Sequence, residues 1–295
     1  MRRKLVKQGA ATMMISLPSK WIKENKLDKG DEVDLIEKNN NIIIGAALQE
    51  KIKKIELTVN FTTESVIRTV ITNAYRVGFD SIKLNFNNEK TFAIIQEVVS
   101  KNLLGFEVIK KEDNFCIIEN ITEPAIDQFD NIFNKIMLNI EELISILENF
   151  DSNPKEFADD ERQIQKFDNF CRRVISKKDF SYKSILNWTF HAHLIHGQRE
   201  VYWLLRYLKL NKKKLDKNSF DLINELKITF AEIKKAYFKK DLSCLDKIQR
   251  DSQEIFYNKG YKYLNTSKDA IPINHLISAI RNFYLATGPL IGLVL

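Results

Sequence analysis

The sequence predicts a multi-domain α+β protein, with a short strand-rich module first, a small α+β layer next and a long helical region last. Three observations indicate this order. Turn-rich, strand-like segments fill residues 1–50, helical and strand-like segments alternate over residues 51–121, and helical periodicity dominates residues 122–295. We expect three domains with these boundaries in the chain of 295 residues.

Charge is unevenly distributed along the chain. The net charge of +7 permits an anionic partner such as nucleic acid but does not require one. Residues 1–29 hold eight of the lysines and arginines and only two acidic residues, Glu24 and Asp28. Positive charge is therefore concentrated at the front of the chain, where we look for a binding surface.

The cysteines and the apolar segments suggest a cellular location. The 3 cysteines are far apart and no signal peptide precedes them, which fits a reducing compartment, and we expect a cytoplasmic protein. No apolar run appears long enough to span a membrane, so no membrane insertion is expected. The apolar tail at residues 284–295 is interrupted by Gly288 and Pro289 and is predicted to be a buried terminal helix.

The first module is predicted to contain two hairpins around a short helix. Strands at residues 4–8 and 12–17 are separated by a Gly-Ala-Ala turn. A helix over residues 18–27 begins with a proline, whose missing N–H costs nothing in the first turn. Strands at residues 33–37 and 42–44, joined across a run of asparagines, close the module.

A module this small cannot bury a core of its own, so we expect a homodimer in which two copies interleave as swapped hairpins. A two-stranded ribbon fits the major groove of DNA, and Gln8 and Thr12, near the turn, could reach base edges. The alternative is a set of solvated lysines on an exposed sheet face. The predicted phosphate contacts are Arg2, Arg3, Lys4, Lys7 and Lys20.

Three motifs in this module resemble the swapped-hairpin DNA-binding domain of the AbrB, MazE and SpoVT family. They are R-R-K-L-V-K-x-G, I-S-L-P-S-K-W and L-D-K-G-D-E-V. Leu17-Pro18-x-x-Trp21 stands at the family's strand–helix junction, and Gly30-Asp31 stands at its turn. The resemblance covers about the first fifty residues and implies an obligate dimer that binds DNA through its N-terminal strands, although such domains sometimes serve assembly alone.

The middle module is predicted to be a small α+β layer. Strands are expected at residues 53–60 and 81–86 and helices at 64–77 and 90–104, followed by a hairpin of two short strands. No catalytic constellation appears here, and we interpret the layer as a spacer or an additional packing layer.

The helical half is predicted to be a six-helix bundle, because apolar residues recur at spacings of three and four along each segment. Its first helix carries an uninterrupted apolar stripe and ends before an Asn-Pro pair. The expected helices cover residues 126–150, 155–177, 181–210, 220–239, 242–263 and 272–294.

This half, behind an AbrB-type module, resembles the archaeal PhoU-like phosphate uptake regulators, in which a swapped-hairpin domain precedes two PhoU-type repeats. The segment from Asp160 to Asp168 looks like the family's acidic helix. That helix carries carboxylates four residues apart, which bind metal clusters. Here Gln165 stands four residues after Glu161, so only Glu161 and Asp168 remain on that face. A multinuclear metal is held poorly by two carboxylates.

We predict no cofactor and no resident metal. His193, His196 and Glu200 share one helix face and could ligate zinc or iron, or they could pack in a helix seam beside a tryptophan. A lone histidine, His275, is interpreted as structural. A further pair four residues apart, Asp221 and Glu225, is interpreted as part of a solvated face.

No phosphate loop, nucleophile elbow or Cys–His arrangement supports an enzyme, and we expect none. The leading hypothesis is a dimeric DNA-binding transcriptional regulator whose helical half senses or relays phosphate status. The alternative is an adaptor that does not bind DNA and whose helical half docks on a transporter or a signalling partner. A third hypothesis is a metal-dependent protein built on the histidine cluster.

Overall fold

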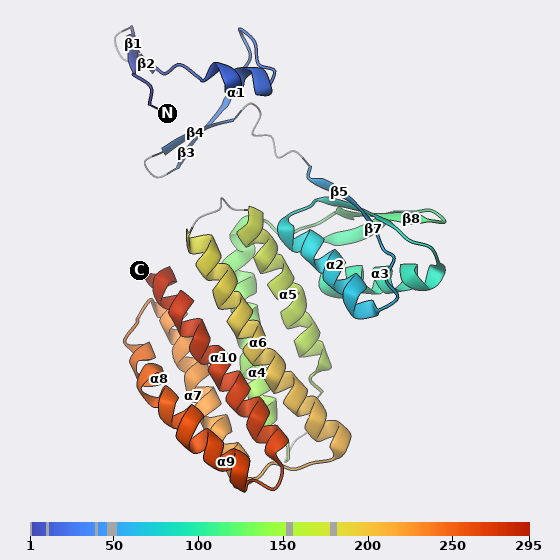
Figure 1. Ribbon diagram of the computed structural model, residues 1–295, viewed down its shortest axis with the longest axis vertical. Helices are drawn as coiled ribbons and strands as arrows, with labels where there is room; N and C mark the ends of the chain where they lie inside the picture. Colours follow the sequence, from blue (N-terminus) through green and yellow to red (C-terminus); the bar gives the residue numbers. More distant parts are fainter. Residues whose placement is uncertain (1, 10–11, 39–40, 46–51, 152–155, 178–181) are drawn as a thin grey trace. The chain divides into compact units, whose positions relative to one another are not determined.

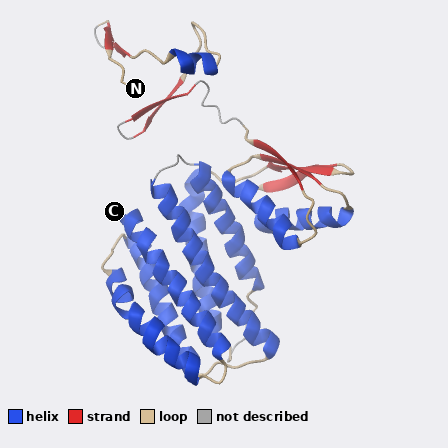
Figure 2. Ribbon diagram, in the orientation of Figure 1, coloured by secondary structure: helices blue, strands red, loops and turns tan. Residues whose placement is uncertain are grey.

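The computed structural model describes residues 2–9, 12–38, 41–45, 52–151, 156–177 and 182–295 (Figure 1). The chain divides into two compact units, residues 1–52 and residues 53–295. The first unit contains four short strands and one short helix joined by loops, and helices dominate the second unit (Figure 2). The mixed α+β class predicted from the sequence is confirmed at this level. The further predicted boundary between residues 121 and 122 stays a prediction.

The first unit consists of two antiparallel hairpins with a short helix between them in the sequence. The first strand begins two residues later than predicted and the second ends three residues earlier. In the described chain the antiparallel pairing joins only Val6–Gln8 to Thr12–Met14. The helix begins at Ser19, with Pro18 as its extended N-cap, and ends at Glu24, three residues earlier than predicted. The elements are β1 (Val6–Gln8), β2 (Thr12–Met14), α1 (Ser19–Glu24), β3 (Asp34–Lys38) and β4 (Asn41–Gly45).

The second unit begins with a four-stranded sheet in the order β5-β6-β8-β7. The strands β5 and β6 are parallel, and β8 runs antiparallel to both of its neighbours. The helix α2 (Glu64–Val77) has the predicted bounds, and α3 (Glu89–Asn102) begins with Asn88, whose side chain accepts from the Thr91 amide. The strands are β5 (Lys54–Thr58), β6 (Ser81–Asn85), β7 (Phe106–Lys111) and β8 (Phe115–Asn120).

Long helices lying side by side form the rest of the second unit (Figure 1). The fifth predicted helix is the main difference, since a π-helical segment (Glu254–Lys259, labelled η2 in the element order) separates α8 (Cys244–Gln253) from α9 (Gly260–Thr266). A 3₁₀ turn, η1 (Ile126–Gln128), precedes the first helix. The other helices are α4 (Phe129–Glu148), α5 (Ala158–Lys177), α6 (Tyr182–Asn211), α7 (Lys217–Lys239) and α10 (Ala270–Val294).

The helix α10 is, in the described part of the chain, the one helix long and apolar enough to cross a membrane. This corrects the expectation that no apolar run reaches that length. The helix packs against α6 and α7, and Ile273, Leu276, Phe283 and Leu290 along it are fully buried. The predicted terminal helix is therefore present, but it continues through Gly288 and Pro289, and within residues 284–295 only Ala286, Thr287 and Leu290 are buried.

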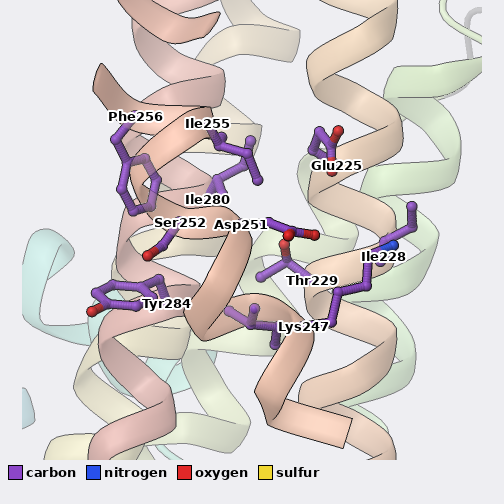
Figure 3. A pocket seen from close by; sticks show the side chains of 11 residues that line it. Glu225, Ile228, Thr229, Lys247, Asp251, Ser252, Ile255, Phe256, Ile280 and Tyr284 are labelled. Carbon is purple, nitrogen blue, oxygen red and sulfur yellow. The ribbon is translucent and has the colours of Figure 1, made fainter. Parts of the chain in front are cut away.

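Two hydrophobic cores fill the second unit, one under the sheet and one among the helices. A small gap in the helical core lies between α7, α8, the π segment and α10, lined by Thr229, Ile255 and Tyr284 among others (Figure 3). Its volume of about 10 Å³ has room for about one water molecule. The core is otherwise close-packed here, so this gap is not a ligand site.

Arg173 of α5 joins the sheet layer to the helices. Its side chain is fully buried and donates through Nη1 to the carbonyl oxygens of Tyr75, at 2.9 Å, and Phe79, at 2.7 Å. The Nε atom donates to Glu123 Oε1 at 2.6 Å, and the guanidinium also pairs with Asp80. A buried cation is stable only when paired and hydrogen-bonded, and here the partners come from the other layer.

Gly105 places Glu123 for this contact. Its φ of +78° lies in the left-handed region, and a Cβ at this position would meet the backbone nitrogen of Glu123 at 2.5 Å. The carbonyl of Gly105 accepts from the amides of Ile121, at 2.8 Å, and Thr122, at 3.1 Å. The absence of a side chain at position 105 therefore lets the segment that carries Glu123 approach closely.

Candidate nucleic-acid interface

The hairpin of β1 and β2 forms a two-stranded ribbon in the first unit. Gln8 lies directly opposite Thr12, Lys7 opposite Met13, and Val6 opposite Met14. Side chains alternate between the two faces of a strand, so Gln8 and Thr12 share one face and Lys7 lies on the other. The structure thus places the two predicted base-reading residues side by side at the turn end of the ribbon.

Every residue predicted to contact DNA is exposed. Arg2, Arg3 and Lys4 precede β1 in extended chain outside the ladder, and Lys20 lies in the first turn of α1. Lys20 pairs with Glu24 at 3.8 Å, and both side chains are largely exposed, so this pair contributes little stability. The basic side chains of this unit are therefore available to an anionic partner.

The first unit has no buried residue among those whose burial the structure describes. Leu35, Ile42 and Ile44 point to one face of the second hairpin and Ile43 to the other, so apolar surface covers both faces. Leu35 is 65% exposed and Ile42 is 70% exposed. Contiguous exposed apolar surface of this kind is typical of an interaction surface.

The histidine cluster of α6 does not assemble as a metal site. Within the described ranges, no three His, Cys, Asp or Glu side chains gather closely enough to hold a metal ion. Glu200 Oε2 lies 2.7 Å from Nδ1 of His275 on α10, so His275 is not alone, as the sequence indicated, but pairs with a carboxylate. Burial and the neighbouring His196 lower the pKa of His193. This geometry favours the packed helix seam.

The two carboxylates of the acidic helix have separate surroundings. Asp168 is fully buried, and its carboxylate contacts Arg172 Nε at 2.8 Å, His191 Nδ1 at 3.2 Å and Arg76 Nη2 at 3.7 Å. Burial alone would raise its pKa, but these cations and the His191 hydrogen bond lower the pKa to about 2. Glu161 lies elsewhere on α5, where burial raises its pKa. The pair does not form one ligand set.

Asp221 and Glu225 on α7 form a helix–helix contact. Lys259 Nζ pairs with Asp221 at 2.7 Å and with Glu225 at 2.9 Å, and the Tyr263 hydroxyl donates to Asp221 at 2.5 Å. The solvated face predicted from their spacing is therefore wrong. Spacing alone could not reveal the partners, since they come from the segment that follows α8.

A cavity that the sequence did not predict lies between α2, α3, α5 and α6. We call it the arginine cavity; it encloses about 760 Å³ and three glutamates line it together with six cations. The sequence pattern that could have indicated this cavity is the spacing of Arg68, Thr72 and Arg76 on one face of α2. A pattern within one helix, however, does not show which other helices lie opposite that face. The cations are Arg68, Arg76, Lys101, Arg162, Arg199 and Arg206.

Comparison with known families identifies the class of the N-terminal domain. Residues 6–56 match a family model described as antidote-toxin recognition MazE, bacterial antitoxin. This part of the chain is therefore MazE/AbrB-like, and the resemblance found in its sequence motifs is confirmed over these residues. No curated protein matches the chain, and no solved structure matches it.

Proposed function

We propose that the protein is a dimeric DNA-binding transcriptional regulator. The first unit would dimerise and contact DNA through β1, β2 and the basic residues before them, and the helices of the second unit would act as a sensor or relay. One observation carries this proposal. The first unit contains an exposed basic two-stranded ribbon, and none of its residues whose burial is described is buried. The match to a MazE-type family model over residues 6–56 supports it.

The regulated process is proposed to be phosphate uptake or a related response, in the cytoplasm and without a catalytic step. This part depends on the resemblance of the helical half to archaeal PhoU-like regulators, in helix order and in its place behind the first domain. It is supported only by the position of helices α4 to α10 in the part of the chain where the sequence predicts the helical half.

The test is the binding of the purified full-length chain to random duplex DNA across a salt series. We compare it with a variant in which Arg2, Arg3, Lys4 and Lys7 are all changed to Ala. The logarithm of the binding constant should fall linearly with the logarithm of salt, with a slope of about −0.9 for each phosphate neutralised. The variant should lose about three to four units of that slope per protomer and bind far more weakly.

The matched control removes four exposed lysines of the second unit, Lys183, Lys214, Lys262 and Lys268. It lowers the net charge by the same amount and should retain most of the affinity. A control that loses as much affinity as the first variant would show that binding follows net charge alone. A wild-type dimer that fails to bind at low salt would contradict DNA binding.

The second candidate is a protein-binding adaptor, and the family description favours it because it names recognition of a toxin by an antitoxin. The apolar faces of the second hairpin would then serve assembly, and the helical half would dock on a protein partner. Absence of DNA binding together with an intact dimer is the outcome that distinguishes this candidate from the regulator.

A further inference from the structure

The arginine cavity is large enough for a small organic ligand. Its volume of about 760 Å³ lies within the range of about 300–1,000 Å³ that is usual for ligand pockets. All four helices that form it belong to the second unit, and α5 contacts both α2 and α3. The cavity is therefore part of one compact unit and does not depend on the placement of the first unit.

The charge of the cavity favours an anion. Four of its six cations pair with carboxylates: Arg68 with Glu64 at 3.2 Å, Lys101 with Glu97 at 2.5 Å, Arg76 with Asp168 at 3.7 Å, and Arg162 with Asp159. Arg199 and Arg206, by contrast, form no ion pair within 4 Å among the described residues, although Glu161 of the same wall interacts electrostatically with Arg199. Two guanidinium groups of the wall are therefore without a direct salt bridge.

Arg199 is held in place by a neutral residue. Its Nη2 atom donates to Gln165 Oε1 at 2.8 Å, and the Gln165 side chain is nine-tenths buried. The Nε2 atom of Gln165 is buried and has no partner in the described residues. Buried polar groups are usually hydrogen-bonded, so the unpaired amide nitrogen in this wall indicates that a bound ligand or a water molecule accepts its hydrogen bond.

Most of the cations are arginines, and an aromatic side chain stands beside them. The guanidinium group matches phosphate oxygens with two parallel hydrogen bonds, which favours phosphate over a single carboxylate. Trp203 is 47% exposed, and the Arg206 Cζ atom lies 5.1 Å from the centre of its ring. The exposed indole offers a planar apolar surface on which a base can stack.

We propose that the arginine cavity binds a nucleotide, with its phosphates on Arg199 and Arg206 and its base against Trp203. Arg76 of α2 lines the same cavity, where it pairs with Asp168 at 3.7 Å and donates to Asn169 Oδ1 at 2.8 Å, and so joins α2 to α5 at the wall. The proposal does not depend on DNA binding by the first unit. Inorganic phosphate or a simple polyphosphate shares part of this chemistry, and the test separates these ligands from a nucleotide.

The experiment is titration calorimetry of the full-length protein with four probes: ATP, tripolyphosphate, inorganic phosphate and adenosine. ATP should bind at least tenfold more tightly than tripolyphosphate, because the base adds stacking to the phosphate contacts. Equal affinity for ATP and tripolyphosphate would overturn the nucleotide assignment. Absence of ATP binding at millimolar concentration would overturn the site itself.

Two variants assign the binding to the cavity. Arg206→Gln should weaken ATP and tripolyphosphate alike by roughly tenfold, which is the worth of one charge-assisted hydrogen bond. Trp203→Leu should weaken ATP by a similar factor and leave tripolyphosphate unchanged. Both residues are exposed on α6, so neither change threatens the fold. If both variants bind ATP as the wild type does, the ligand sits elsewhere.

The matched controls carry the same changes outside the cavity. Arg250→Gln removes an exposed arginine of α8, and Tyr261→Leu removes an exposed aromatic side chain of α9. Both should bind ATP like the wild type. The variant with Arg2, Arg3, Lys4 and Lys7 changed to Ala should also bind normally, since loss of ATP binding there would move the site to the first unit and overturn the proposal.

Discussion

Asp168 illustrates what a single residue contributes to this fold. Its buried carboxylate contacts cationic side chains of α2 and of its own helix, and a histidine of α6. From the sequence it was interpreted as the remnant of a metal-binding pattern. Its partners lie 23 or more residues away on other helices, apart from Arg172, so no local spacing could predict that it holds helices together instead.

Replacing this carboxylate should destabilise the protein strongly. Asp168→Asn leaves the buried Arg172 and the partly buried Arg76 without their counter-charge, and we expect a loss of about 3 kcal/mol in the free energy of unfolding at pH 7. The pKa of Asp168 is about 2 in the folded state, below the value of about 3.9 for an unfolded chain. Its stabilisation is thus complete above pH 4 and lost as the pH falls towards 2.

The measurement is denaturant unfolding of wild type and variant at several pH values. The difference between them should shrink below a pH of about 4. Asp246→Asn is the control, because Asp246 pairs with Arg250 at 3.1 Å with both side chains mostly exposed, and it should cost at most about 0.5 kcal/mol. An equal cost for both variants would contradict the role assigned to burial.

The helices show how well the spacing of apolar residues predicts where a helix begins and ends. Both ends of α2 were predicted to the residue, because a clean apolar stripe ends at a glycine. The π segment after α8 was missed, since its residues keep a helical pattern while one turn widens. The close approach of α6 and α10 at Gly197 was likewise invisible, because it depends on which helix faces which.

The contact of α6 with α10 can be tested at Gly197. A Cβ at this position would meet the ring of Phe283, with Cδ1 only 2.6 Å away. Gly197→Ala should therefore destabilise the protein by about 1–3 kcal/mol, although alanine favours helices by about 1 kcal/mol. Thermal unfolding provides the measurement.

Gly288→Ala is the matched control within α10. Nothing lies within 4 Å of a Cβ built there, so this change should leave stability unchanged or raise it by up to about 1 kcal/mol. Stabilisation by both substitutions would show that the two helices have room to separate at Gly197.

At the scale of the whole molecule, sequence reasoning identified the first domain and the α+β class but not the arginine cavity. The residues of the Leu-Pro-x-x-Trp and Leu-Asp-Lys-Gly-Asp motifs are close together in the chain, so these motifs can be recognised from the sequence alone. The cavity brings together Arg76 and Arg199, which are far apart in the chain, and only the packed fold shows that they face the same space.

The uncovered apolar surface of the first unit predicts a stable dimer. The full-length wild type should sediment at twice the chain mass of 34.5 kDa. Leu35→Glu places a charge on the exposed apolar face of the second hairpin and should shift the protein to the monomer. Analytical ultracentrifugation over a range of concentrations measures both.

Leu210→Glu is the control for this prediction. Leu210 lies on α6 and is 70% exposed, against 65% for Leu35, so the two substitutions are closely matched in size and exposure. The control should remain a dimer. A wild type that sediments as a monomer would contradict dimerisation through the first unit, and a monomeric control would place the interface on the helices.

The contact of Arg173 with Glu123 also constrains how the sequence can diverge. Loss of the arginine would leave Asp80 and Glu123 beside each other with only Lys177 to pair with both. Loss of Glu123 would remove one of the two carboxylates that neutralise the buried Arg173. A side chain at Gly105 would displace Glu123 and so have the same effect. We therefore expect the three positions to vary together across related sequences, which makes them a compact signature for recognising proteins that share this two-layer unit.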